Sequence, residues 1–276
     1  MHVTRRLGGP ILALTLLAAA GCGGGSDESG TPGVARSATH AWGDYHWART
    51  SNPFTLYLGD NVSSAWDAYL GTASSDWSQS TVLDTVVVAG GTRPRPCKAT
   101  TGRVEVCDAS YGYNGWLGVA SITYNTADHH IVSGTVKMND SYFKTSTYNT
   151  SDWRQLVMCQ EIGHTLGLDH QDTNFDNANL GTCMDYTSNP AGPPSNLHPN
   201  QHDYDELATI YQHLDTTTTV GQVVAAGLPG KSEDVPEAAE WGRLVRASAD
   251  GRLAVYELDV GDGQSVLTFV IWALDR

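Results

Sequence analysis

Basic residues are scarce in this chain. Its 276 residues include 16 Lys and Arg against 30 Asp and Glu, so the formal net charge at pH 7 is −14. Removing residues 1–21 as a leader takes away Arg5 and Arg6 but no acidic residue, which brings the net charge to −16. Because a surface of this sign repels phosphate, nucleic acid is excluded as a partner.

The N-terminal apolar run is too short to span a bilayer. It covers residues 11–20, follows Arg5 and Arg6, and leads through Ala19-Ala20-Gly21 into Cys22. This arrangement resembles a bacterial lipoprotein signal over residues 1–21. The resemblance implies that Cys22 carries a lipid and that the protein is anchored in the cell envelope, with the lipid as its only membrane contact. Ordinary signal-peptidase cleavage nearby, which gives a freely secreted protein, is the alternative.

Cysteine is also scarce, and the count of five is odd. Lipidation of Cys22 explains the odd one and leaves Cys97, Cys107, Cys159 and Cys183 to pair in an oxidising compartment. The short separation of the first two favours a Cys97–Cys107 disulfide that closes a hairpin.

The composition divides the mature chain into three parts. Residues 22–50 are interpreted as a flexible tether because their first half is rich in Gly, Ser and Thr. Residues 51–215 carry the strand and helix patterns of one domain. Residues 216–276 are interpreted as a linker followed by a small β-meander, with strands expected at 241–247, 252–260 and 265–274.

Within the domain, strands are expected at 54–58, 81–89, 115–124 and 130–138. A helix pattern that opens at Asp60-Asn61 follows the first of these strands. A second helix is expected to begin with Ser151 as its N-cap and Asp152 in its first turn, and a third to span residues 201–213.

A zinc-protease pattern in this chain lacks its first histidine. The segment CQEIGHTLGLDH, residues 159–170, matches HExxHxxGxxH at Glu161, His164, Gly167 and His170 but has Gln160 in the first ligand position. Positions 160 and 164 point the same way on a helix, with Glu161 beside them. A left-handed Gly167 ends that helix and returns His170 to the same point.

Met184 and Tyr186 follow, and the Met-x-Tyr spacing resembles a Met-turn. Together these residues resemble the metzincin family of zinc endopeptidases. The resemblance implies an α+β fold with a twisted mixed sheet, a zinc-site helix and a C-terminal helix. It implies one catalytic Zn²⁺ held by Gln160, His164 and His170, with Glu161 as general base.

The resemblance assigns further roles. Tyr186 would bind the zinc or donate to the transition state, and Met184 would form an apolar floor under the metal. A Cys159–Cys183 disulfide would join the zinc helix to the Met-turn. Protein or peptide substrates would pair with an edge strand formed by Gly115, Trp116, Leu117, Gly118, Val119 and Ala120. We expect a monomer.

Three other features were weighed as sites. The segment 93–97 superficially resembles the cysteine switch of matrixins, but its position inside the domain and the nearness of Cys107 favour the disulfide. Asp172, Asn174 and Asp176 alternate as in calcium loops, although an EF-hand Gly and late Glu are missing, so Asx turns are the simpler interpretation. His129 and His130 are neighbours that point to opposite faces of a strand, and we interpret them as surface residues.

Two functions from different classes follow. The first is a zinc metalloendopeptidase with Gln160 as an unusual ligand. The second is a pseudoprotease that binds peptides or a surface partner. Glu161 favours the first, because a buried carboxylate without chemistry to perform is costly. A structural envelope lipoprotein has no sequence feature behind it.

Overall fold

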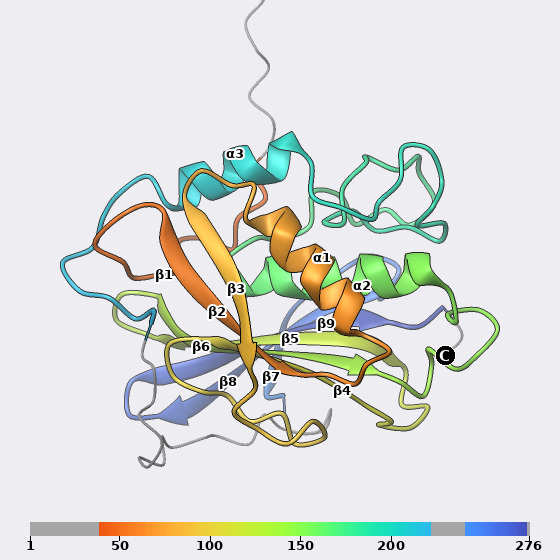
Figure 1. The fold of residues 1–276 in the computed structure, drawn as a ribbon, viewed down its shortest axis with the longest axis horizontal. Helices are drawn as coiled ribbons and strands as arrows, with labels where there is room; N and C mark the ends of the chain where they lie inside the picture. The colour runs from red at the N-terminus through yellow and green to blue at the C-terminus, as the bar shows by residue number, and fades with distance from the viewer. Residues whose placement is uncertain (1–38, 222–240, 275–276) are drawn as a thin grey trace, which may run out of the picture. The chain divides into compact units, whose positions relative to one another are not determined.

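Nine strands and three helices make up the parts of the chain that the computed structural model describes, residues 39–221 and 241–274 (Figure 1). The lipoprotein signal, Cys22 and most of the predicted tether lie outside these residues. In chain order the elements are β1 (His46–Trp47), β2 (Phe54–Asn61), α1 (Asp67–Trp77), β3 (Leu83–Ala89), β4 (Val104–Ala109), β5 (Trp116–Asn125), β6 (His130–Asn139), α2 (Ser151–Thr165), α3 (Gln201–Ile210), β7 (Arg243–Ala247), β8 (Leu253–Gly261) and β9 (Gln264–Trp272).

The strands form one mixed sheet in the order β3-β2-β4-β6-β5-β9-β8-β7, with β1 beside β6. Strands β3, β2, β4 and β6 are parallel to one another, and β5, β9, β8 and β7 continue the sheet in antiparallel pairs. Helices α1 and α2 lie side by side on one face of this sheet (Figure 1). The predicted α+β class with a mixed sheet is confirmed.

The strands of the predicted C-terminal β-meander extend the same sheet. Strand β9 pairs with β5 along its whole length, from Trp116 opposite Trp272 to Asn125 opposite Gln264. A hairpin alone leaves its backbone groups and apolar face exposed, so pairing with an existing sheet is the stable arrangement.

Several boundaries differ from the predictions because strand pairing decides them. Strand β2 runs on through Asp60 and Asn61, which pair with β3 and β4, so the helix begins only at Asp67. The tether expected up to residue 50 ends earlier, since β1 lies inside it and Trp47 is fully buried. The prediction of a hairpin closed by Cys97 and Cys107 was wrong. Strand β4, which contains Cys107, pairs in parallel with β2 and β6, whereas a hairpin is antiparallel.

Both disulfides expected from the sequence are present. Cys97 pairs with Cys107, and Cys159 pairs with Cys183. Two disulfides indicate an oxidising, extracellular compartment. In the part of the chain that is described, no helix has the length and apolar character needed to cross a bilayer.

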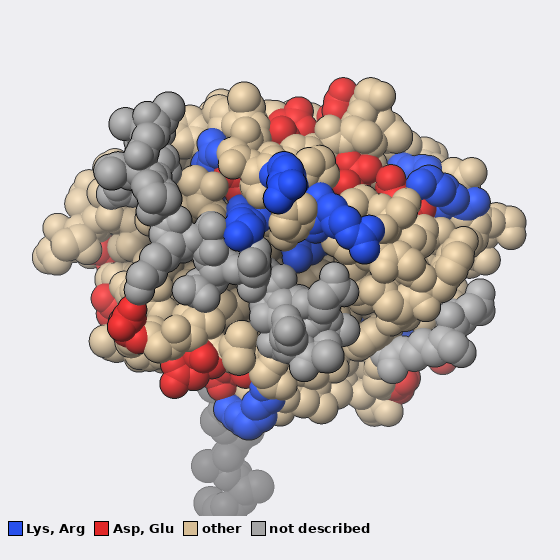
Figure 2. Space-filling view, turned by 90° about the horizontal axis from the view of Figure 1, so that it is seen from below, with Lys and Arg blue, Asp and Glu red and all other residues tan. Residues whose placement is uncertain are grey.

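The acidic excess is not spread evenly over the surface. Figure 2 shows Lys and Arg side chains gathered on the face of the sheet opposite α1 and α2, with acidic groups around them. Net charge alone therefore does not predict a preference for basic substrates on this face.

The Cys159–Cys183 bond is expected to stabilise the fold appreciably. It closes a loop with a sequence separation of 24, which corresponds to about 3 kcal/mol in the chain-entropy account. Replacing both cysteines by Ala should lower the free energy of unfolding, measured by urea denaturation, by about this amount. The matched control is Cys97→Ala/Cys107→Ala. The disulfide that it removes closes a shorter loop, of separation 10, so the free energy of unfolding should fall by somewhat less. An unchanged midpoint in the first variant would contradict the prediction.

Candidate functional site

Helix α2 carries three of the predicted site residues, and its ends are well defined. The N-cap is Thr150, whose side chain accepts from Trp153 N, rather than the expected Ser151. At the other end Gly167 has φ +98°, and a Cβ there would lie 2.6 Å from the Tyr45 carbonyl oxygen. Only glycine fits both demands, so the chain turns here and brings His170 back to His164.

The two histidines meet in a dry environment. Their ring centroids are 4.5 Å apart, and the side chain of His164 is fully buried. His164 Nδ1 donates to the Leu168 carbonyl oxygen at 2.9 Å, which leaves Nε2 as the lone-pair nitrogen. His164 Nε2 and both ring nitrogens of His170 are buried without a hydrogen-bond partner.

Both imidazoles are held neutral. Burial lowers the pKa of His164 to about 3, with His170 acting in the same direction. Burial also lowers the pKa of His170, although Asp169 opposes it. Neutral imidazole with a free Nε2 lone pair is the form that binds a metal ion.

Asp169 lies behind His170 and connects it to the C-terminal strands. Its Oδ1 is 3.6 Å from His170 Nδ1, and its Oδ2 pairs with Arg246 of β7. Burial alone would raise the pKa of Asp169, but His170 and Arg246 outweigh it and lower the value to about 2. The carboxylate therefore stays charged and orients His170 from behind.

Glu161 is the most isolated polar group of the site. It is fully buried, and neither carboxylate oxygen has a hydrogen-bond partner. Burial raises its pKa well above the usual range, while the Ala120 backbone amide acts in the opposite sense. A Cβ on Gly118 would lie 2.4 Å from Glu161 Oε1, so the missing side chain at 118 is what admits the carboxylate next to β5.

Gln160 is fixed by the segment that contains Met184. Its Nε2 donates to the Cys183 carbonyl oxygen at 2.7 Å. Gln160 directly follows Cys159, which forms the disulfide with Cys183. The amide nitrogen is thus committed, and Oε1 is the only atom of this side chain that can serve as a metal ligand.

Met184 packs directly under the helix. The residue is fully buried, and a Cβ added to Gly163 would lie 2.5 Å from its Sδ and 2.7 Å from Trp77 Cζ2. Because Gly163 has no side chain, α2 approaches Met184 and α1 closely. This arrangement is consistent with a packing role for Met184.

Tyr186 lies against His170 but is engaged elsewhere. The two ring centroids are 4.7 Å apart, while the hydroxyl donates to the Arg252 carbonyl oxygen at 2.9 Å. Arg252 directly precedes β8, so Tyr186 is held by the C-terminal part of the chain.

The predicted edge strand is not at an edge. Residues Trp116 to Ala120 lie in β5, which has β6 on one side and β9 on the other. Beyond the strand itself, Gly115 O accepts from Ala273 N at 2.7 Å. The expectation of a free edge was wrong because the C-terminal strand satisfies these backbone groups.

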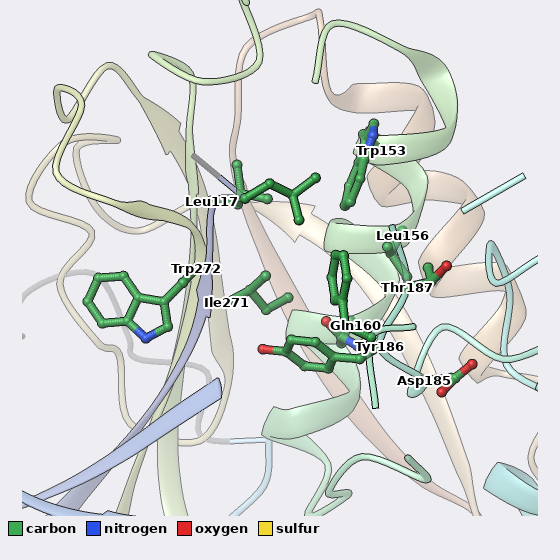
Figure 3. A pocket seen from close by; sticks show the side chains of 11 residues that line it. Leu117, Trp153, Leu156, Gln160, Asp185, Tyr186, Thr187, Ile271 and Trp272 are labelled. Atoms are coloured by element: carbon green, nitrogen blue, oxygen red, sulfur yellow. The ribbon is translucent and has the colours of Figure 1, made fainter. Parts of the chain in front are cut away.

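Strand β9 also covers the histidines. Phe269 stacks on His164, with ring centroids 4.9 Å apart and an interplanar angle of 10°. Ile271 of β9 and Leu117 of β5 face Leu156 and Gln160 of α2 across a narrow pocket (Figure 3). Its volume is about 10 Å³, room for about one water molecule.

The loop proposed for calcium uses its side chains to cap its own turns. Asp172 Oδ1 accepts from Asn174 N at 2.7 Å, and Asn174 Oδ1 accepts from Asp176 N at 3.1 Å. This is the Asx-turn arrangement that was the alternative to calcium. Calcium at this loop stays a prediction.

Sequence reasoning missed Phe269 and Arg246, which reach the site from strands far along the chain. It also missed a second group, His46, His213 and Asp215, whose ligand atoms all lie within 4.8 Å of one another. His130 joins this group through Asp215, whereas His129 turns away to Asp44. No local spacing in the sequence signals either set.

No family model and no curated protein matches the chain. Among solved structures it is similar to myroilysin, with 12% sequence identity and a TM-score of 0.35, covering 59% of this chain and 82% of that one. It is also similar to high choriolytic enzyme 1, a hatching enzyme zinc-protease from the medaka Oryzias latipes, with 12% identity and a TM-score of 0.31, covering 60% and 94%. Similarity this distant leaves function to be argued from the residues of the site.

Proposed function

We propose that this protein is a zinc-dependent metalloendopeptidase. The observation that carries the proposal is a set of buried polar atoms without a hydrogen bond of ordinary geometry, namely His164 Nε2, His170 Nε2 and the carboxylate oxygens of Glu161. Orphaned groups of this kind are rare because each costs free energy on burial. A cation accepts both lone pairs and compensates the carboxylate, so these residues fit a zinc ion.

His164, His170 and Gln160 Oε1 would hold the ion, and the ion when bound would acidify water and polarise a peptide carbonyl. Glu161 is the base. It would take a proton from the attacking water and return it to the leaving amine. Arg246 keeps the Asp169 carboxylate charged, and this carboxylate orients His170.

We further propose that the described conformation is a closed, resting form. Strand β9 fills the position beside β5 that a substrate strand would take, and Phe269 covers His164. A pocket of about 10 Å³ admits no peptide side chain. Cleavage then requires β9 to leave β5 over the stretch from Thr268 to Ile271, which includes Phe269.

The second candidate function is a binding protein of the same architecture without catalysis. Two observations favour it, the closed site and the amide ligand at position 160, whose nitrogen is already bonded to Cys183 O. In this alternative β9 stays in place, and a partner binds at the outer strands.

Replacing Glu161 by Gln should remove the base while preserving the volume of the side chain. We expect kcat for cleavage of an unfolded protein such as casein to fall by about 10²- to 10⁴-fold, the usual contribution of a general base. Because the amide carries no buried charge, the thermal midpoint should not fall. The matched control is Glu206→Gln on α3, a buried carboxylate outside the site. Equal activity in the two variants would refute the role of Glu161.

Replacing Gln160 by His should tighten zinc binding, since imidazole is a stronger donor to zinc than an amide oxygen. The expected gain is about 10- to 100-fold, the range typical of changes around metal ligands. Competition with a chromogenic chelator measures it, in a His213→Ala background so that the second cluster does not contribute. An affinity unchanged from that background would mean that position 160 does not bind the metal.

If the closed form is inactive, a covalent link between β9 and β5 should abolish cleavage. Ser121 and Thr268 lie opposite each other in the two strands, with their hydroxyl oxygens 3.0 Å apart, so a Ser121→Cys/Thr268→Cys variant can form a disulfide. The oxidised double variant should lose casein cleavage, while the single Ser121→Cys variant under the same conditions retains it. Equal rates would show that β9 need not move and that the closure proposal is wrong.

A further inference from the structure

We propose that the protein has a second metal site, suited to zinc, formed by His46, His213 and Asp215. The site contains no residue of α2 and joins two distant segments, namely β1 and the segment that follows α3. It does not depend on the proposed peptidase function.

The three ligand atoms have the spacing of neighbouring ligands around zinc. His46 Nε2 and His213 Nε2 are 3.2 Å apart, and each lies 3.5 Å from Asp215 Oδ1. His130 Nε2 lies 3.3 Å from the same oxygen but is not within reach of all three. Zinc bonds of about 2.0–2.1 Å place neighbouring ligands of a tetrahedron about 3.3 Å apart.

Groups behind the ligands hold them in the orientation that metal binding requires. His46 Nδ1 donates to the Asp44 carbonyl oxygen at 2.6 Å. Asp215 Oδ2 accepts from both the Arg49 side chain at 2.8 Å and the Arg49 backbone amide at 3.1 Å. Partners of this kind are typical of metal ligands, because they direct Nε2 and the free carboxylate oxygen to the ion.

The cluster is also shielded from solvent. The side chains of His46 and Asp215 are 6% and 8% exposed, so these polar groups lose most of their hydration on folding, and a bound cation would replace it.

His213 provides a clean test because its side chain is 52% exposed, so His213→Ala removes a ligand without opening the core. The matched control is His198→Ala, an equally exposed histidine paired with Asp76 elsewhere. Chelator-stripped full-length protein is reloaded with Zn²⁺ alone, desalted, and its metal content measured. His213→Ala should hold about one zinc per chain less than wild type and His198→Ala.

A second readout separates this site from the one on α2. Zinc should raise the thermal midpoint of a stripped His164→Ala variant, which retains the second site, but not that of His164→Ala/His213→Ala. Equal zinc content in His213→Ala and His198→Ala, or a zinc response that persists in the double variant, would overturn the proposal. If His164→Ala alone loses no zinc, the proposed peptidase function fails while this site stands.

Discussion

The constraint on which the structure depends is the burial of α2 on every side from Gln155 to Thr165. The sheet approaches it at Gly118, Met184 and Trp77 meet it at Gly163, and the Cys159–Cys183 bond joins it to the segment that contains Met184. A stretch of helix without a solvent-facing side has to satisfy its polar residues internally, and the Glu161 carboxylate and His164 Nε2 have no hydrogen-bond partner. The stability of the domain is therefore linked to whatever ion or substrate group completes these residues.

The C-terminal strands make the same region both stable and closed. By pairing with β5, strand β9 removes the long unpaired edge that the sheet would otherwise expose, and its Phe269 covers His164. Contacts from β7 and the start of β8 add to this, since Arg246 pairs with Asp169 and the Arg252 carbonyl accepts from Tyr186. An opening of these strands would release the substrate position and two side chains beside the histidines together.

Hydrogen bonds connect the neighbours of His46 and His213 to the end of α2. Trp47, next to His46, donates from its indole nitrogen to the Thr165 carbonyl oxygen, and Tyr211, two residues before His213, donates to the Leu166 carbonyl oxygen. These two carbonyls belong to the end of α2, where the chain turns at Gly167 toward His170. A metal that fixes His46 and His213 would thus stabilise the turn that assembles the candidate active site.

What the sequence determined by itself is local. The spacing of Gln160, Glu161, His164, Gly167 and His170 specified a helix, its left-handed stop and the return of the second histidine, because helical period and glycine conformation depend on neighbours in the chain. Only the tertiary structure decided that β5 is internal, that Tyr186 is held by Arg252, and that His46, His213 and Asp215 converge. These depend on strand pairing and packing between residues far apart in sequence, where no local periodicity records the partner.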